Sequence, residues 1–316
     1  MEEGAKATSK GGGKRVLKRG LLGLLAVSFV GASSAGIYAY AQTSAYDASV
    51  QKVYDVPVPA LSRSNDPTVV ARGKHLVESV AGCGIHECHA SDLAGGNVTD
   101  VGPIGNFVAP NITPGGVIAA YGDGELARLI RHGIKKDGRT ARFMTSEEIN
   151  WLPDSDLVAV ISYVRSVAPV DRPNATMEIK PFGKVLDRRG LMHIDVARYI
   201  DHAHIDVAPA AAPTAEYGRY IAKLCLGCHG EHLSGGHIPG TPPSFPTPLN
   251  LTPHETGLKG WTYDDFDQLI KTGVRKNGQH LQALMPVEAL SRMDDVEKHA
   301  LWAYLQSLPP MPLGNR

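Results

Sequence analysis

The chain has 316 residues, enough for two compact domains, and its 32 Lys and Arg residues are balanced by 32 Asp and Glu residues. The resulting formal net charge of zero excludes bulk nucleic-acid binding, because a protein needs a basic face to neutralise phosphates. The four cysteines form two tight pairs, each followed by a histidine, which favours a cofactor or metal site over a disulfide scaffold.

The N-terminal segment has the features of a targeting signal. A basic tail (1–20) precedes an apolar run (21–41) that is long enough for a helix to cross a bilayer core of about 30 Å. The cationic flank predicts a cytoplasmic tail, so we expect an inner-membrane anchor with the rest of the chain in the periplasm. The letters "AYA" at 39–41 resemble a signal-peptidase site, which leaves a soluble periplasmic protein as the alternative. Residues 42–68 are expected to be a linker.

The rest of the chain contains an internal repeat with an offset of about 140 residues. The spacings between matching residues agree as well as the letters do. The matching segments are "CGIHECH" (83–89) and "CLGCH" (225–229), "NITP" (111–114) and "NLTP" (250–253), "LIRHGIKKDGR" (129–139) and "LIKTGVRKNGQ" (269–279), and "DLVAVISYVRSVAPV" (156–170) and "EKHALWAYLQSLPPM" (297–311). This predicts two copies of one domain, at 69–170 and 214–312, joined by a connection (171–213) that lies over both.

Each module is predicted to consist of helices separated by loops, so the expected fold class is all-α. A short helix leads to the cysteines, and a middle helix with apolar residues at helical spacing ends at a glycine. A last amphipathic helix begins at acidic residues, which suit the positive end of the helix dipole. The expected helices are 69–80, 123–133 and a third from about 154 in the first module, and 214–224, 263–273 and a third from about 294 in the second.

The second module carries the c-type haem motif in its standard form, "CLGCH". The thiols of Cys225 and Cys228 lie three positions apart on a helical turn, so both reach one porphyrin. His229 then lies under the iron as the proximal ligand. Zinc is the main alternative, but it usually needs four ligands, and the other two cysteines occupy the equivalent place in the first module.

Two methionines in matching positions are the candidates for the sixth iron ligand. Met144 and Met285 each lie 19 residues before a repeated tyrosine. A thioether opposite a histidine is the usual ligand pair of a cytochrome c haem, whereas packing in the core is the ordinary role of a methionine. Met293 is the competitor in the second module, but it has no counterpart in the first.

The first module departs from the motif because Cys83 and Cys88 are separated by four residues. Three interpretations stay open: attachment through both thiols with a bulged spacer, a single thioether from Cys88 with Ile85 in place of the first cysteine, or a lost site. His89 keeps its spacing to the methionine, which favours a haem. His86, inside the spacer, is interpreted as an exposed loop side chain.

Residues around the two sites follow from the same alignment. A proline-loop carbonyl in the Gly-Pro pair at 102–103 or the Thr-Pro pair at 241–242 is expected to accept a hydrogen bond from the proximal histidine and orient its ring. A simple rigid turn is the alternative. The histidines His193, His202 and His204 of the connection are interpreted as covering the surface between the domains and not as metal ligands.

With these motifs the chain resembles the class I cytochromes c, over about 69–170 and 214–312. It is similar to the membrane-anchored di- and tri-haem cytochromes c of bacteria, including the cytochrome subunits of alcohol and gluconate dehydrogenases. The resemblance implies two small helical cytochrome c domains and two covalent haems c. The residues that would hold them are Cys83, Cys88, His89 and Met144 in the first module and Cys225, Cys228, His229 and Met285 in the second.

The function that the resemblance implies is transfer of single electrons. The donor would be a quinol-oxidising complex or a dehydrogenase, and the acceptor a protein such as a terminal oxidase. Because two axial ligands close each iron, we expect no catalysis by this chain. The zero net charge leads us to expect no nucleic-acid partner. A dihaem peroxidase and a structural haem subunit of a larger membrane complex are the alternatives.

Overall fold

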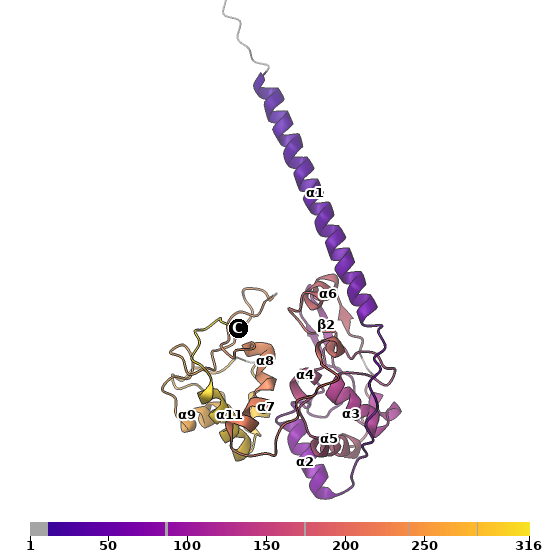
Figure 1. Cartoon of the computed structure of the whole chain (residues 1–316), viewed down its shortest axis with the longest axis vertical. Helices are drawn as coiled ribbons and strands as arrows, with labels where there is room; N and C mark the ends of the chain where they lie inside the picture. The colour runs from indigo at the N-terminus through magenta and orange to yellow at the C-terminus, as the bar shows by residue number, and fades with distance from the viewer. Residues whose placement is uncertain (1–11, 86–87, 174, 240, 283) are drawn as a thin grey trace, which may run out of the picture.

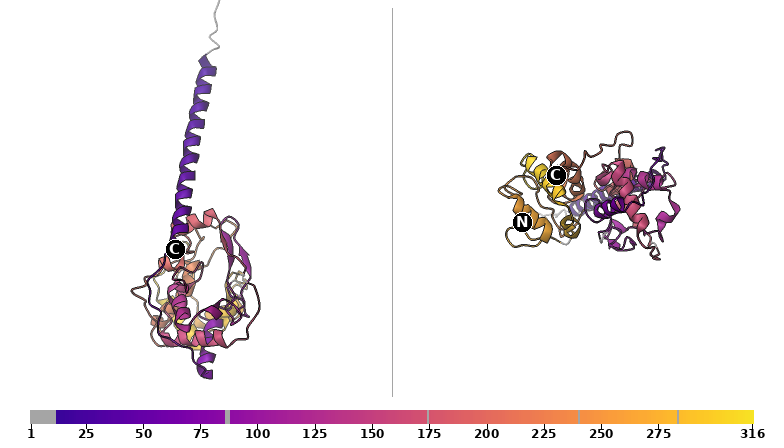
Figure 2. Two further views of the ribbon diagram at one scale, coloured as in Figure 1. Left: turned by 90° about the vertical axis from the view of Figure 1, so that its right-hand side faces the viewer. Right: turned by 90° about the horizontal axis from the view of Figure 1, so that it is seen from below.

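A computed structural model describes residues 12–85, 88–173, 175–239, 241–282 and 284–316. The chain forms a long N-terminal helix and two helical modules that lie side by side (Figure 1, Figure 2). The helices are α1 (Gly12–Ser49), α2 (Pro67–Glu78), η1 (Val117–Ala120), α3 (Asp123–His132), α4 (Ser146–Ile149), α5 (Asp154–Ser166), α6 (Pro181–Arg188), η2 (Val196–Tyr199), α7 (Ala215–Ile221), α8 (Lys223–His229), α9 (Tyr263–Thr272), α10 (Val287–Ser291) and α11 (Asp295–Ser307), with η1 and η2 being 3₁₀ turns.

Helix α1 projects from the first module as a rod, and only its C-terminal turns touch the rest of the protein (Figure 1). There Tyr46 is buried against a small apolar cluster that includes Ile104 and Leu186. Helix α1 continues to Ser49, so the first part of the predicted linker is helical. Within the described residues, the structure contains no helix that is both long and apolar enough to span a membrane. The predicted transmembrane anchor at 21–41 is therefore not supported.

Both modules are built around the same crossing of two helices. In the first module, α2 crosses α5 at Gly73, where an added Cβ would lie 1.9 Å from the carbonyl oxygen of Ala159. In the second, α7 crosses α11 at Gly218, and the added Cβ would again lie 1.9 Å from a carbonyl oxygen, that of Ala300. Only glycine lets two backbones approach so closely. The repeat found in the sequence is therefore also a repeat of the packing.

The middle helices confirm the prediction that each module contains a helix ending at a glycine. Helix α3 ends at Gly133 with φ 63°, and α9 ends at Gly273 with φ 68°. Both glycines adopt the left-handed conformation that commonly terminates a helix. At the other end of α9, Thr262 and Asp265 form a reciprocal capping box that satisfies free backbone N–H groups. The C-terminal ends of α3 and α9 precede the two methionine loops. The local sequence thus determines where each loop begins.

The prediction of an all-α chain is wrong in one place, because the mostly helical structure includes a small antiparallel sheet. Strand β2 (Gly105–Val108) lies between β1 (Val98–Asp100) and β3 (Glu178–Ile179). Strand β3 comes from the predicted connection, so the pairing joins residues about 70 positions apart. Phe107 on β2 is buried, and the apolar cluster beneath the sheet keeps it attached to α6 and α1.

The connection between the modules lies mainly on the first module, which corrects the expectation that it covers both. Helix α6 packs against α1, and the amide of Ala208 donates to the carbonyl of Trp151 in the first module. The second module is reached through Asp206, which accepts hydrogen bonds from Arg219 (3.0 Å) and Tyr220 (2.7 Å). The sequence could not predict which module this connection packs against, because residues 171–213 have no counterpart in the internal repeat.

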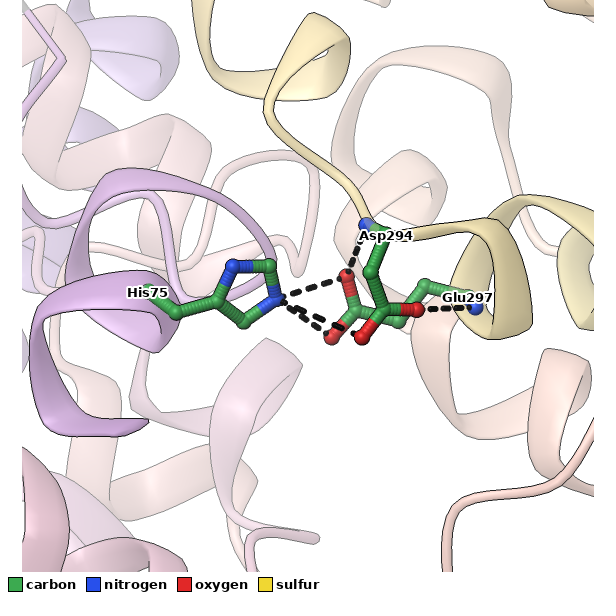
Figure 3. Close-up of side chains that lie close together, drawn as sticks. All are labelled: His75, Asp294 and Glu297. Atoms are coloured by element: carbon green, nitrogen blue, oxygen red, sulfur yellow. Dashed lines mark hydrogen bonds and ion pairs between the residues drawn. The ribbon is translucent and has the colours of Figure 1, made fainter. Parts of the chain in front are cut away.

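The modules share one apolar core, and charged side chains join them at its edge. His75 on α2 faces Glu297 and Asp294 at the start of α11 (Figure 3). Glu297 is fully buried, and Arg72 on α2 lies 3.6 Å from it while also binding Asp156 at 3.0 Å. A buried carboxylate of one module is thus neutralised by cations of the other.

Candidate haem sites

Helix α8 carries the three motif residues of the second module, and its last residue is His229. The ring of His229 is buried, and its Nδ1 lies 2.7 Å from the carbonyl oxygen of Leu249. A carbonyl oxygen only accepts hydrogen bonds, so Nδ1 carries the proton and Nε2 keeps its lone pair. This is the tautomer that a metal-binding histidine needs, with its ring orientation held by the backbone.

The first module reproduces this arrangement despite its longer cysteine spacer. Nδ1 of His89 lies 2.7 Å from the carbonyl oxygen of Pro110. The amide of His89 donates to the carbonyl of Cys83 (3.1 Å), which brings the first cysteine close to the histidine. Burial lowers the pKa of both His89 and His229, which favours the neutral imidazole in each module. His86, interpreted above as an exposed loop side chain, lies outside the described residues.

The predicted acceptors in the pairs 102–103 and 241–242 are wrong. Gly102 lies in the turn between β1 and β2, where its carbonyl accepts from Lys180. The acceptors found, Pro110 and Leu249, each precede the asparagine of the repeated "N-x-T-P" motif. The sequence signal that identifies them is therefore the repeated asparagine and not the proline loop.

The repeated asparagines hold these acceptor carbonyls in place. Asn111 is fully buried; its side chain accepts from the amide of Thr113 (2.9 Å) and donates to the carbonyl of Val170 (2.8 Å). Asn250 is the equivalent residue, and it donates to the carbonyl of Met311 at 2.7 Å. Each asparagine thus ties the histidine loop to the chain that leaves the last helix of its module.

The thiols lie in surroundings that differ from a zinc site. Burial raises the pKa of Cys83 and of Cys225 to about 12 and also raises that of Cys228. Among the described residues, the one His/Cys/Asp/Glu group close enough to hold a metal ion contains no cysteine. The zinc alternative is therefore not supported.

Met144 and Met285 occupy the same place in their modules. Each is partly buried in the loop before a short helix, α4 or α10. Each carbonyl accepts from the amide two residues later, Ser146 (2.8 Å) or Val287 (2.7 Å). Met293, the competitor, is 4% exposed and lies in the shared apolar core, as a packing residue does. The role of the two loop methionines as iron ligands stays a prediction.

Two histidines of the connection, His193 and His202, have partners other than a metal. His193 lies 2.7 Å from Glu147 and stacks on Tyr199 with ring centroids 3.7 Å apart. The Nδ1 atoms of His202 and His132 are 3.2 Å apart, and no third ligand joins this pair within the described part of the chain. These rings cover the first module, close to the loop of Met144.

The chemical character of both sites fits a covalently attached haem. Each offers a neutral imidazole with its Nε2 lone pair available, thiols shortly before it in the chain, and a methionine in a repeated position. Each site also borders the apolar core, which excludes water from a porphyrin. The residues present therefore suit this cofactor in both modules.

Comparisons with known proteins support a haem c in this chain. Residues 211–305 match the family model described as cytochrome C oxidase, cbb3-type, subunit III. The chain is 32% identical over 285 residues to the fructose dehydrogenase cytochrome subunit of Gluconobacter japonicus, which covers 80% of this chain and 54% of the relative. It is 33% identical over 107 residues to the gluconate 2-dehydrogenase cytochrome c subunit of Pantoea cypripedii, which covers 31% of this chain and 24% of the relative.

A third relative is the cytochrome c subunit of the alcohol dehydrogenase (quinone) of Komagataeibacter europaeus, with 33% identity over 102 residues, 30% of this chain and 22% of the relative. The matches thus span from about a fifth to about half of the relatives' own length. These relatives are named as cytochrome subunits, in agreement with the prediction of an electron-transfer protein that is not itself the enzyme. The chain is similar to the cytochrome c subunits of bacterial dehydrogenases, and the part that matches the family model is the second module.

Proposed function

We propose that this chain is a dihaem electron-transfer subunit, with one covalent haem c in each module. The observation that carries the proposal is the identical 2.7 Å contact between a histidine Nδ1 and a backbone carbonyl in both modules. A module that had lost its haem would have no need to keep a histidine in the metal-binding tautomer. The unusual spacer of the first module is therefore interpreted as a functional variant of the motif.

Each haem would supply a reversible one-electron change of its iron, and the protein would set how easily that change occurs. The roles in the second module are representative. Cys225 and Cys228 would attach the porphyrin, and Nε2 of His229 would bind the iron. The carbonyl of Leu249 raises the basicity of that imidazole by accepting a hydrogen bond from its Nδ1–H group. Met285 would close the opposite side, so that electrons pass while substrates are excluded.

In the first module we favour attachment through both Cys83 and Cys88. The backbone bond from the amide of His89 to the carbonyl of Cys83 keeps the first cysteine near the histidine despite the longer spacer. A single thioether from Cys88 is the alternative. The position of the haem absorption band separates the two, because each thioether removes one vinyl group from the porphyrin conjugation.

We further propose that the electron donor is a dehydrogenase that assembles with this chain. The relatives that match are named as subunits of fructose, gluconate and alcohol dehydrogenases. The acceptor would be a further redox protein or a respiratory complex. Export to the periplasm is part of the proposal, because it is supported by the basic tail followed by an apolar run. Cell fractionation tests the location.

The first test is the haem content of the purified chain, measured from the pyridine haemochrome spectrum. Two haems per chain are expected, together with retention of one haem in the variant His89→Ala and in the variant His229→Ala. One haem per wild-type chain would overturn the dihaem proposal and leave the first module as a scaffold. Carbon monoxide binding to the reduced protein is the second measurement, since strong binding without added ligands would favour a peroxidase-like enzyme.

A further inference from the structure

Three side chains from the two modules converge at the edge of the shared core (Figure 3). His75 projects from α2 of the first module, and Asp294 and Glu297 lie at the start of α11 in the second. One donor atom from each residue lies within 4.8 Å of the other two. A histidine ring nitrogen and carboxylate oxygens are donors that divalent transition metals bind. None of the three residues belongs to a haem motif, so this cluster is separate from the haem sites.

A reciprocal pair of hydrogen bonds orients the two carboxylates. Oδ1 of Asp294 accepts from the amide of Glu297 (2.8 Å), and Oε2 of Glu297 accepts from the amide of Asp294 (3.0 Å). This capping box occupies one oxygen of each carboxylate. The other oxygens, Oδ2 of Asp294 and Oε1 of Glu297, face His75. Backbone hydrogen bonds thus hold both donor oxygens toward the imidazole, as groups behind a metal site hold its ligands.

The separations between the donor atoms suit a zinc ion. Nε2 of His75 lies 2.9 Å from Oε1 of Glu297 and 3.9 Å from Oδ2 of Asp294. Zinc is bound tetrahedrally with bonds of about 2.0–2.1 Å, which places neighbouring ligand atoms about 3.3 Å apart. The two observed distances lie on either side of that value. A bound ion therefore requires a change of only about 0.5 Å in each separation.

Burial and charge at the cluster also favour a divalent cation. The side chain of Glu297 is fully buried, whereas that of Asp294 is 49% exposed, so an ion can enter from solvent and keep water as a further ligand on that side. Arg72 lies 3.6 Å from Glu297 but also binds Asp156 at 3.0 Å. Three carboxylates are thus balanced by one guanidinium, which leaves two negative charges for the ion.

The cluster is not a consequence of the internal repeat. The counterpart of His75 is Tyr220, whose hydroxyl donates to Asp206 (2.7 Å). The counterpart of Glu297 is Asp156, and its helix α5 has no side-chain cap at the N-terminus. The equivalent positions therefore hold a tyrosine in place of the histidine and no capping box. The complete donor set is found on one side of the pair of modules.

We propose that His75, Asp294 and Glu297 form a zinc site that joins the two modules. The ion replaces the direct contact between His75 and Glu297, and it is held by the first module through an imidazole and by the second through two carboxylates. It thereby fixes α2 against α11 and with them the two modules. Calcium does not suit the site, because it takes about six to eight oxygen ligands and not an imidazole. The zinc site does not depend on the proposed electron transfer.

The test is a calorimetric titration of the full-length holoprotein with zinc chloride, after dialysis against a chelator. One equivalent of zinc per chain is expected, and calcium chloride at the same concentration should not compete with it. His75→Gln and Asp294→Asn should each weaken zinc binding at least about tenfold. Because asparagine caps a helix as well as aspartate does, Asp294→Asn removes the charge and keeps the start of α11.

His299→Gln is the matched control, since it removes an exposed histidine from the same helix and should leave the zinc affinity unchanged. No zinc binding by the wild-type protein, or wild-type affinity in both ligand variants, would overturn the proposal. So would an equal loss of affinity in His299→Gln and His75→Gln, because the ion would then lie on the surface of α11.

Thermal unfolding supplies a second readout of the link between the modules. A ligand that binds only the folded protein raises its unfolding temperature. Saturating zinc should therefore raise the unfolding temperature of the wild-type protein and of His299→Gln, but not that of His75→Gln. An equal rise in His75→Gln would show that zinc binds elsewhere and would contradict the site.

Discussion

Nε2 of His75 lies 2.9 Å from Oε1 of Glu297, and this contact joins the first helix of one module to the last helix of the other (Figure 3). The hydrogen bond to Glu297 raises the pKa of His75 above its ordinary value of 6.5. Protonated His75 therefore stabilises the folded protein fully below that value, and the contribution is lost as the pH rises through the higher folded pKa.

The free energy of unfolding is therefore expected to fall as the pH is raised from 6 through the raised pKa of His75. The variant His75→Gln, which carries no titratable group at this position, should lack this slope. Urea unfolding of both proteins at a series of pH values measures the difference. An identical slope in the two proteins would show that His75 does not carry the linkage.

Removal of the buried carboxylate should cost far more than removal of an exposed one. Glu297→Gln leaves Arg72 and His75 facing a neutral group, and we expect a loss of about 3 kcal/mol in the free energy of unfolding. Glu288 pairs with Arg292 at 2.8 Å but is largely exposed, so Glu288→Gln should cost less than about 1 kcal/mol. Comparable losses in the two variants would contradict the role given to Glu297.

The helix crossings predict a severe effect of very small substitutions. Gly73→Ala and Gly218→Ala each place a methyl group against a carbonyl oxygen that cannot move away, and each should destabilise its module by about 3 kcal/mol. Gly36 in α1 has no atom within 4 Å of an added Cβ, so Gly36→Ala should cause no loss. Thermal unfolding followed by circular dichroism compares the three variants. Two crossings with unequal costs would show that the modules are packed differently.

Glu148 predicts a second pH dependence, which arises from the burial of a carboxyl group and not from an ion pair. Burial, with a contribution from Glu147, raises the pKa of Glu148 to about 8, so the folded state prefers the protonated carboxyl. The free energy of unfolding should therefore fall as the pH rises from about 4.5 toward 8. Glu148→Gln removes this cost and should stabilise the protein by about 2 kcal/mol at pH 7. The exposed Glu255 supplies the control, since Glu255→Gln should leave the pH profile unchanged.

The buried asparagines predict a loss of stability that is equal in the two modules. Asn111→Ala and Asn250→Ala each leave a buried carbonyl and a buried amide without their partner, and each should cost about 2–3 kcal/mol. Asn277 lies in an exposed turn, so Asn277→Ala should cost less than about 1 kcal/mol. Calorimetry of the holoproteins measures all three. A small effect at Asn111 alone would mean that the first histidine loop is held by other contacts.

Part of the site was predictable because it depends on short-range geometry. The positions of Cys225, Cys228 and His229 on one helical turn follow from the spacing of three letters, and the glycines Gly133 and Gly273 end their helices as their sequence context predicts. The internal repeat extended this reading to the first module. The matching placement of the methionine loops follows from the same repeat.

Other features could be seen only in the folded chain. The carbonyls that accept from the two histidines, the small sheet, and the contacts of residues 194–197 with residues 140–143 all join residues that are distant in sequence. The segment 171–213 has no repeat partner, so its letters contain no sign of which module it covers.

The sequence by itself thus determined two repeated helical modules and the matching places of their cysteines, histidines and methionines, because local spacing dictates which side chains share a helical turn or a loop. The tertiary structure alone decided how the modules differ. Whether a loop is covered or open depends on which distant segment packs against it, and such packing is settled by the burial of apolar surface across the whole chain and not by any local pattern.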